Sequence, residues 1–467
     1  MLNGRWVGRT LLVLGVLLLA ACGGKSSPGL ILYQPADEAG QPALELVVVN
    51  VNGDEQRRIP LSGPLRMKGV ATQTSYRALF FTEDGAVYLV DARDGTAQKL
   101  DLLPQDGRQL YPNHLGFSWA HGKRWTVLGD VRGNLAYLTD LKTGQVTDLV
   151  YDRLVFFGRF SPDDAYLALA GDKGFWLVPT SSPEDARRLD AWNVRFSNDG
   201  RQIVYIEIDR EVGEHRIVVE AVDGSESEVV FTADSPLLDV AFGPRDNQLF
   251  VRGEDALFLL NTDDGTSEEL LPYDPPAQLQ FSSDGTKLVF GYKREETMVW
   301  YWIDLTEGTV KPLDNLPPDY PIPCQNAPTR QMLFAEQALE VEERHYTLLN
   351  LESGEAKDMA LSGKEAGMPF VLECSGDGRF GLVLSLFQGA GQQQRQLWLL
   401  DVGKGQARLL AQADEVRGAL SPDGQWVAVN TIKQEGETAE PTLTLVRTEG
   451  EETRPLGAGY LHAWVRP

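Results

Sequence analysis

The chain has 467 residues, in which 67 acidic side chains outnumber 43 basic ones and leave a formal net charge of −24. Nucleic-acid phosphates select a basic surface, so this charge argues against a nucleic-acid partner and against adhesion to an anionic membrane through surface charge. The acidic excess either keeps a large protein soluble or selects a basic partner or divalent cations.

The first 21 residues read as a targeting segment rather than as part of the fold. Arg5 and Arg9 precede an apolar stretch over 11–19, and the sequence LAAC follows and ends at Cys22. The apolar stretch is too short to span a bilayer comfortably. The segment resembles the signal and lipobox of bacterial lipoproteins. That resemblance implies cleavage before Cys22 and acylation of Cys22, whereas the alternative is a plain secretory signal with a chance cysteine.

Residues 22–28 form a flexible lipidated linker in this interpretation. Gly23 follows the cysteine, as in lipoproteins that are sorted to the outer membrane. The resemblance therefore implies a place in the cell envelope, on the periplasmic side of the outer membrane. Contact with the membrane would be made through the lipid alone, because several acyl chains hold a protein stably where one is marginal.

One phrase recurs through residues 29–467, in which an apolar residue, a serine and a turn rich in Asp and Gly lead into alternating apolar residues. Its copies are FSSDGTKLVF from Phe281, FSPDDAYLALA from Phe160, FSNDGRQIVYI from Phe196, CSGDGRFGLVL from Cys374 and LSPDGQWVAVN from Leu420. Asp bonds its own backbone in turns and Gly accepts positive φ. Each copy therefore predicts two antiparallel strands joined by a tight turn.

The expected ends of the first strands lie about 36 to 50 residues apart, which is the period of four-stranded propeller blades. These ends are Phe117, Phe160, Phe196, Phe242, Phe281, Cys324, Cys374, Leu420 and Trp464. About ten units follow the linker. The first, from Gly29, lacks a first strand, and residues 460–467 at the other end form a single strand. Pairing these two segments would close a ring and remove open edges, which invite aggregation.

The FSPDG-type turns resemble those of Tol-B-like and WD-repeat-like β-propellers across nearly all of residues 29–467. The resemblance implies an all-β fold, a β-propeller of about ten four-stranded blades in one ring. Two alternatives stay open, namely degenerate units among the ten and two smaller propellers in tandem. The phrase is specific for the architecture and says little about activity.

Cys324 and Cys374 fall at equivalent positions, the apolar ends of the first strands of neighbouring units. Such positions come close near the axis of a propeller, and an extracytoplasmic compartment is oxidising. We expect either a disulfide between them or two buried thiols that act as small hydrophobic side chains.

Long connections are expected on one face of the ring, between the second and third strands and between units, while tight turns occupy the other face. They are longest towards the C-terminus, as in FQGAGQQQRQ from Phe387 and KQEGETAEP from Lys433. Loops on a rigid scaffold usually carry binding, and exposed tyrosines beside charges are common anchors. The candidate partner-binding residues are Tyr273, Asp319, Tyr320, Glu343 and Arg344.

Catalytic and metal-binding motifs do not emerge from the sequence. The five histidines are His114, His121, His215, His345 and His462. None of them forms an HExxH pair, and no GxSxG sequence is present. The pairs Asp163-Asp164 and Asp263-Asp264 read as turn residues, with a Ca²⁺ site as the alternative. We expect no cofactor.

Two hypotheses for the function remain. The first is a membrane-anchored, non-catalytic scaffold that binds a protein or peptide of the cell envelope. The alternative is a propeller enzyme or lectin that acts on polysaccharide or a small polar substrate at the channel mouth. An enzyme requires several carboxylates, or a histidine with carboxylates, to converge, and the sequence favours the scaffold.

Overall fold

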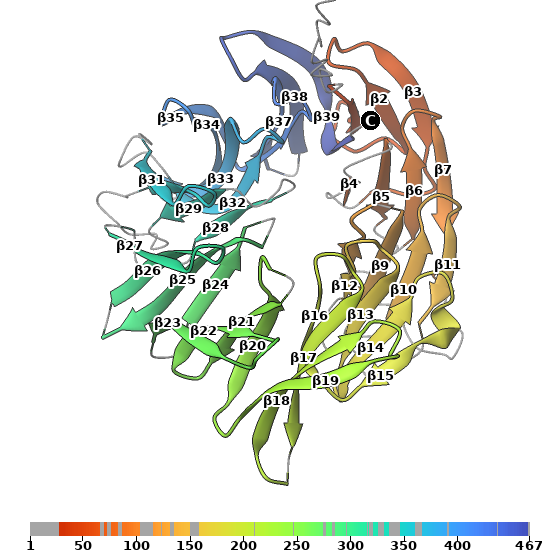
Figure 1. Cartoon of the computed structure of the whole chain (residues 1–467). Coiled ribbons are helices and arrows are strands. Elements are labelled where there is room, and N and C mark those ends of the chain that lie inside the picture. The colour runs from red at the N-terminus through yellow and green to blue at the C-terminus, as the bar shows by residue number, and fades with distance from the viewer. Residues whose placement is uncertain are drawn as a thin grey trace, which may run out of the picture.

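The computed structural model describes most of the chain from Pro28 onwards (Figure 1). The described residues are 28–65, 70–71, 76–82, 86–102, 115–122, 124–130, 135–149, 158–209, 211–245, 247–273, 277–282, 285–295, 297–314, 316, 321–325, 331–335, 346–359, 367–389, 392–436 and 438–465. The signal segment and Cys22 lie outside them.

The described fold is all-β and follows the repeats. Strands β1 to β19 are β1 (Leu30–Pro35), β2 (Glu45–Val49), β3 (Glu55–Pro60), β4 (Val70–Ala71), β5 (Arg77–Phe81), β6 (Val87–Asp91), β7 (Thr96–Leu100), β8 (Leu115–Trp119), β9 (Trp125–Asp130), β10 (Leu135–Asp140), β11 (Gln145–Asp148), β12 (Arg159–Phe160), β13 (Tyr166–Gly171), β14 (Gly174–Pro179), β15 (Arg187–Leu189), β16 (Trp192–Phe196), β17 (Gln202–Asp209), β18 (Glu214–Ala221) and β19 (Ser227–Ala233). A 3₁₀ turn, η2 (Pro183–Asp185), lies between β14 and β15.

The second half continues the same pattern. Its strands are β20 (Leu237–Phe242), β21 (Gln248–Gly253), β22 (Ala256–Asn261), β23 (Ser267–Pro272), β24 (Ala277–Phe281), β25 (Lys287–Arg294), β26 (Thr297–Asp304), β27 (Thr309–Leu313), β28 (Ile322–Gln325), β29 (Gln331–Ala335), β30 (Tyr346–Asn350), β31 (Glu355–Asp358), β32 (Met368–Cys374), β33 (Phe380–Gly389), β34 (Gln392–Asp401), β35 (Gln406–Ala413), β36 (Glu415–Leu420), β37 (Trp426–Glu435), β38 (Thr438–Arg447) and β39 (Thr453–Val465). Within the described segments, no helix is long and apolar enough to cross a membrane.

Most of the sheets are antiparallel and consist of four consecutive strands. The described strands make six four-stranded sheets, one of seven strands (β3-β2-β1-β39-β38-β37-β36) and one of eight (β31-β30-β29-β28-β32-β33-β34-β35). Figure 1 shows the sheets following one another in an arc whose red and blue ends meet at the top. The first strands of several neighbouring sheets contact each other, as in β8 with β12 and β16 with β20. These first strands therefore lie on the inner side of the arc.

The repeated phrase forms the tight turn between the first two strands of a sheet. In LSPDG, the buried Ser421 hydroxyl donates to Asp423 Oδ1 at 2.6 Å and accepts the backbone N–H of Trp426 at 2.9 Å. Gly424 has φ +67°, a conformation that favours glycine. The same serine–aspartate bond recurs in three further copies. The phrase is therefore a hydrogen-bonding unit that reverses the chain.

The hydrophobic core lies between the sheets rather than at a single centre. Phe250 of one sheet packs with Leu288 and Phe290 of the next, and Trp302 packs with Phe334 of the sheet after that. Each sheet therefore buries its faces against its two neighbours, and the stability of the fold depends on the contacts between successive sheets.

The last strand joins the two ends of the chain. β39 pairs with β38 through its first half and with β1 through its second, in the register Leu30↔Val465 to Pro35↔Gly459. Trp464 Nε1 also donates to the carbonyl of Pro28 at 2.7 Å. The sequence predicted this pairing of residues 460–467 with the first sheet.

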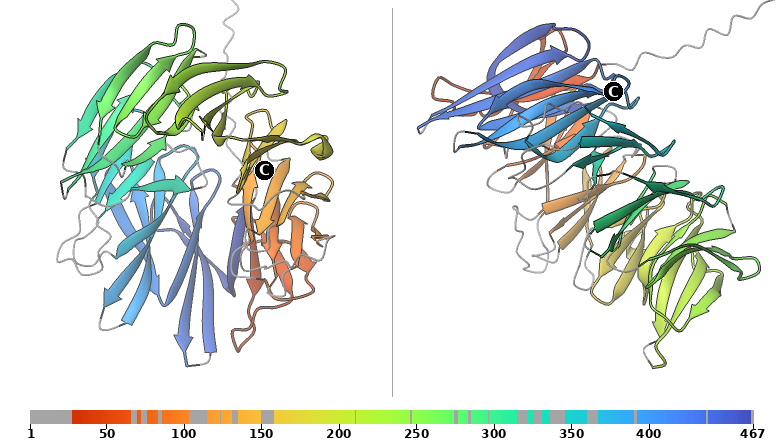
Figure 2. Two further views of the ribbon diagram at one scale, coloured as in Figure 1. Left: turned by 90° about the horizontal axis from the view of Figure 1, so that it is seen from below. Right: turned by 90° about the vertical axis from the view of Figure 1, so that its left-hand side faces the viewer.

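The expected long loops of the C-terminal units are largely strands, which corrects the sequence analysis. Phe387 pairs with Gln394 and Gly389 with Gln392 within the β33–β34 hairpin, and Lys433 pairs with Glu440 within β37–β38. These blue hairpins project in the left view of Figure 2. Their polar side chains suggested loops, but pairing satisfies their backbone groups while both faces meet solvent. The corresponding segment over 338–345 lies outside the described residues.

Candidate binding site

Exposed apolar side chains gather on one face of the arc. Of the seven large apolar residues that are exposed in the described chain, five lie at the end of the sheets where the second and third strands connect and the first strands begin. These five are Leu44, Trp192, Val212, Leu238 and Phe370. Single exposed apolar residues are ordinary, and these five come from four sheets but lie on the same side of the arc. We call this side the hairpin face and the opposite side the turn face.

Three of these residues lie at or beside bulges in inner strands. The register shifts after Trp192 in β16, at Leu238 in β20 and at Phe370 in β32. Asn193, next to Trp192, has φ +57°, which asparagine tolerates better than most residues. A bulge re-aims side chains locally, and Trp192 is consequently 63% exposed.

A charged cluster adjoins Trp192 on the inner strands β16 and β20. Arg195 pairs with Asp239, with Nη2 at 3.3 Å from Oδ1 and 3.4 Å from Oδ2. Asn193 Nδ2 also donates to Asp239 Oδ1. Asp239 is buried, and the buried Arg195 Nε has no hydrogen-bond partner among the described residues. The cluster therefore leaves a partly buried guanidinium incompletely satisfied.

Arg159 of the inner strand β12 adds a second cation to this cluster. Arg159 is exposed, but many protein atoms lie around its side chain. The resulting loss of solvation, together with the nearby charge of Arg195, lowers the pKa of Arg159 to about 10. The charge of Asp239 opposes this shift. No hydrogen bond or ion pair within 4 Å satisfies Arg159 in the described part of the chain. We call Arg159, Arg195, Asp239 and Asn193 the inner-strand cluster.

This cluster was not predicted from the sequence, although a signal was present. Arg159 and Arg195 each stand directly before the phenylalanine of the repeated phrase, in RFSPDD and RFSNDG. An arginine at an inner-strand position of two successive sheets places two cations side by side. The two arginines can be recognised as neighbours only once it is known that the first strands of successive sheets lie side by side.

A cleft of about 950 Å³ lies on the turn face, over the sheets β8–β11 and β12–β15. Its walls include Arg124, Asp140, Tyr166, Asp185 and Asp223. Arg124 Nη2 lies 2.8 Å from Asp140 Oδ2, and its guanidinium lies over the ring of Trp125. Burial raises the pKa of Asp140, but hydrogen bonds from Arg124 and the Lys142 backbone outweigh it and hold the pKa below its usual value.

Tyr273 is not an exposed anchor, which corrects the prediction for this residue. Its side chain is buried, its hydroxyl donates to the carbonyl of Gly253, and its ring meets Phe290 edge-on. The residue ends a sheet and fills the space between two sheets, which a position in the sequence cannot reveal. The other four candidates, Asp319, Tyr320, Glu343 and Arg344, lie outside the described residues.

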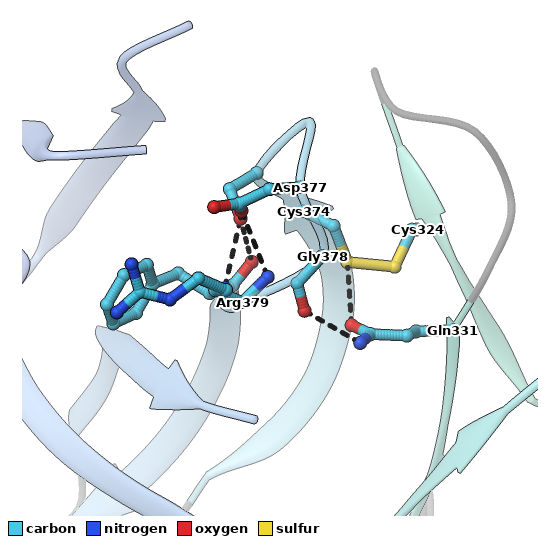
Figure 3. Close-up of a disulfide and its surroundings, with 8 residues drawn as sticks. Cys324, Gln331, Cys374, Asp377, Gly378 and Arg379 are labelled. Carbon is cyan, nitrogen blue, oxygen red and sulfur yellow. Dashed lines mark hydrogen bonds between the residues drawn. A yellow bond between two sulfur atoms is a disulfide. The ribbon is translucent and has the colours of Figure 1, made fainter. Parts of the chain in front are cut away.

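Cys324 and Cys374 are bonded to each other in the structure, with Cα atoms 5.5 Å apart (Figure 3). They belong to the inner strands β28 and β32, which pair in parallel. Gln331 of β29 reinforces the same junction, because its Nε2 donates to the carbonyl of Gly378 at 2.8 Å. This is one of the two arrangements that the sequence left open for these cysteines.

The two aspartate pairs bond as turn residues. Asp163 Oδ1 accepts the Ser161 hydroxyl, and Asp164 accepts the backbone N–H groups of His121 and Gly122 from the preceding sheet. Asp264 accepts Thr266 in the same way. Among the described residues, no three His, Cys, Asp or Glu side chains gather as metal ligands would.

The fold is that of a β-propeller. No family model matches the chain, and no curated protein does. A eukaryotic initiation factor is similar to it at a TM-score of 0.52 and 11% identity, over 94% of this chain and 99% of that one. At such identity the likeness shows the fold alone.

Two further solved structures are more distantly similar. An oligogalacturonate lyase in complex with manganese has a TM-score of 0.39 and 15% identity over 86% of this chain and 96% of its own. TolB from Acinetobacter baumannii has a TM-score of 0.25 and 16% identity over 74% of this chain and 80% of its own. Likeness at this level carries no argument about activity.

Proposed function

We propose that this protein is a lipid-anchored, non-catalytic β-propeller scaffold that binds a protein or peptide partner in the bacterial cell envelope. The observation that supports this role most is the gathering of five exposed apolar side chains on the hairpin face, on a rigid frame of sheets. A broad surface with aromatic and apolar anchors suits a macromolecular partner. The resemblance of the segment that ends at Cys22 to a lipobox supports the anchor, and Gly23 after it supports the periplasmic side of the outer membrane as the location.

The frame of this scaffold is a single ring of ten four-stranded blades. The pairing of β39 with both β38 and β1 supports it, because the end of β39 supplies the first strand that the β1–β3 sheet lacks. Each other blade consists of four consecutive strands, from β4–β7 to β36–β39. A closed ring leaves only the short outer strands as edges.

The second candidate function is an enzyme or lectin that acts on polysaccharide or a small polar substrate. The cleft on the turn face favours it, since Tyr166, Asp185 and Asp223 line about 950 Å³ beside Trp125. Against it, the Arg124 and Asp140 side chains in its wall already bond each other.

Affinity capture from detergent-solubilised envelope tests the scaffold, with the lipidated protein as bait. A face variant combines Trp192→Ala with Val212→Asp, which alters two exposed residues of the hairpin face. The control is Arg201→Ala on the turn face, whose side chain is 86% exposed. We expect one stoichiometric partner that the wild type and Arg201→Ala capture and the face variant loses.

Two results would contradict the scaffold role. One is equal capture by the face variant and the control, which would remove the hairpin face from the interaction. The other is the absence of any partner combined with binding on a glycan array, which would favour the second candidate. A Cys22→Ala protein that still partitions with membranes would contradict the anchor alone.

A further inference from the structure

The inner-strand cluster carries one more positive than negative charge. Arg159 and Arg195 face a single carboxylate, Asp239, which already accepts hydrogen bonds from Arg195 and Asn193. Arg159 has no hydrogen-bond or ion-pair partner in the described part of the chain. Arg159 is exposed and can meet an anion from solvent, while the buried Nε of Arg195 has no partner among the described residues and is costly to leave unsatisfied.

An apolar surface lies next to this charge on the same strands. Trp192 stands three residues before Arg195 on β16, which is roughly 10 Å at the rise of a strand. Leu238, directly before Asp239 on β20, is also exposed, and Asn193 bridges to its carbonyl. An indole face next to guanidinium groups offers stacking at one end and charge-assisted hydrogen bonds at the other.

We propose that the inner-strand cluster and Trp192 form a binding site for a small monocarboxylate with an apolar or aromatic body. The carboxylate is received by Arg159 and Arg195, because guanidinium donors match its geometry. The apolar body lies along Trp192 and Leu238. Inorganic phosphate fits less well, since it lacks the apolar body that Trp192 and Leu238 would contact. A highly acidic macromolecule fits less well, because the chain itself has a formal net charge of −24 and would repel it.

This site shares Trp192 and Leu238 with the hairpin face, but its test measures ligand binding and does not use envelope extract. The mature, detergent-solubilised protein is titrated calorimetrically with 4-phenylbutyrate, which carries a carboxylate and a ring about the length of the site apart. The neutral isostere 4-phenyl-1-butanol and inorganic phosphate are titrated in parallel. We expect the carboxylate to bind at least about tenfold more tightly than either.

Arg159→Gln is the decisive variant. The Arg159 side chain has no hydrogen-bond or ion-pair partner among the described residues, so its replacement should not disturb folding. We expect it to weaken 4-phenylbutyrate at least about tenfold and to leave 4-phenyl-1-butanol unchanged. Arg201→Gln, an exposed arginine in the turn after β16, is the matched charge control and should bind as the wild type does. Trp192→Ala should weaken both aromatic probes by a similar factor.

Three results would overturn the proposal. They are equal binding of the acid and the alcohol, equal affinity of Arg159→Gln and Arg201→Gln, and no heat of binding for 4-phenylbutyrate at millimolar concentration. Phosphate that binds as tightly as the carboxylate would overturn the ligand class. Because the scaffold test reads partner capture, either hypothesis can fail while the other stands.

Discussion

His462 is a buried ionisable group where the last strand meets the first. Its Nε2 donates to Gln34 Oε1 of β1 at 2.9 Å, and its ring meets Phe80 of β5. Nδ1 has no partner among the described residues. Burial, followed by the nearby charge of Arg417, lowers the pKa of His462 to about 3. The neutral ring therefore belongs to the folded state.

The low pKa of His462 predicts a loss of stability in acid. In the unfolded state, His462 binds a proton below its ordinary pKa of about 6.5. In the folded state it binds that proton only near pH 3. The free energy of unfolding should therefore fall as the pH drops through that window, by up to about 1.4 kcal/mol per pH unit from this group. Chemical denaturation of the wild type and His462→Gln at pH 7, 6, 5 and 4 measures the slope.

The comparison isolates one group from the many carboxylates that also titrate in acid. His462→Gln removes the proton-binding site but keeps a polar side chain beside Gln34, so its stability should depend on pH less steeply than that of the wild type between pH 6 and 4. Parallel curves for the two proteins would show that His462 binds its proton equally in both states.

At the residue scale, the sequence predicted local turn residues better than the contacts that side chains make with neighbouring sheets. The serine–aspartate turns could be predicted, because their hydrogen bonds are local, as in Ser421 and Asp423. Tyr273 was misplaced on the surface, since its burial depends on Phe290 of the next sheet. Arg159 and Arg195 were missed for the same reason. Contacts between sheets depend on twist and spacing, which no single repeat contains.

At the element scale the repeat of four antiparallel strands was predictable and the loop boundaries were not. Alternation and tight turns marked the strands, but the polar stretches after Phe387 and Lys433 are paired hairpins rather than loops. Polarity distinguishes exposed from buried residues, and both faces of a projecting hairpin are exposed. A polar hairpin therefore cannot be distinguished from a polar loop by its sequence pattern.

The disulfide between β28 and β32 links two sheets through their inner strands. It closes a loop across 50 residues, and loop-closure entropy assigns such a cross-link about 2–4 kcal/mol. We expect Cys324→Ser/Cys374→Ser to lower the thermal midpoint of unfolding. Reductant should lower the wild-type midpoint towards the same value and leave the double variant unchanged. Scanning calorimetry with and without dithiothreitol measures both effects.

The parallel pairing of β28 with β32 and the Gln331 hydrogen bond remain in the double variant. The variant should therefore stay folded, with near-ultraviolet circular dichroism like that of the wild type. A wild type whose midpoint does not respond to reductant, and equals that of the double variant, would mean that the cross-link adds nothing to stability.

At the scale of the whole molecule, residues 460–465 complete the first sheet. Leu461, Trp464 and Val465 are buried there, and each buried side chain of this kind is worth about 1.5–3 kcal/mol. Their joint loss is comparable to the total stability of a typical domain. We expect a chain that ends at residue 459 to aggregate, as judged by size-exclusion chromatography. A chain that ends at residue 465 keeps β39 and is the control. A monomeric, cooperatively melting 459-residue chain would contradict a ring closed by this strand.

The place where the chain enters the first sheet predicts how the anchored protein faces the membrane. Pro28 lies beside Trp464, at the end of β39 where β1 begins, so the linker emerges from the turn face. Cys22, the proposed point of lipid attachment, is six positions earlier in the chain, which is at most roughly 20 Å of extended chain. The turn face should therefore lie next to the membrane, and the hairpin face should point away from it, towards a partner.

Fluorescence quenching in lipid vesicles tests this orientation. Single cysteines replace Glu451 in the turn after β38 and Lys433 near the tip of β37, two exposed positions of one sheet. Each is labelled in the lipidated protein, in vesicles that contain headgroup spin-labelled lipid. We expect strong quenching at position 451 and little at 433, because nitroxides quench over short distances only. Cys22→Ala should abolish quenching at both. Stronger quenching at 433 would place the hairpin face against the membrane, where no soluble partner could reach it.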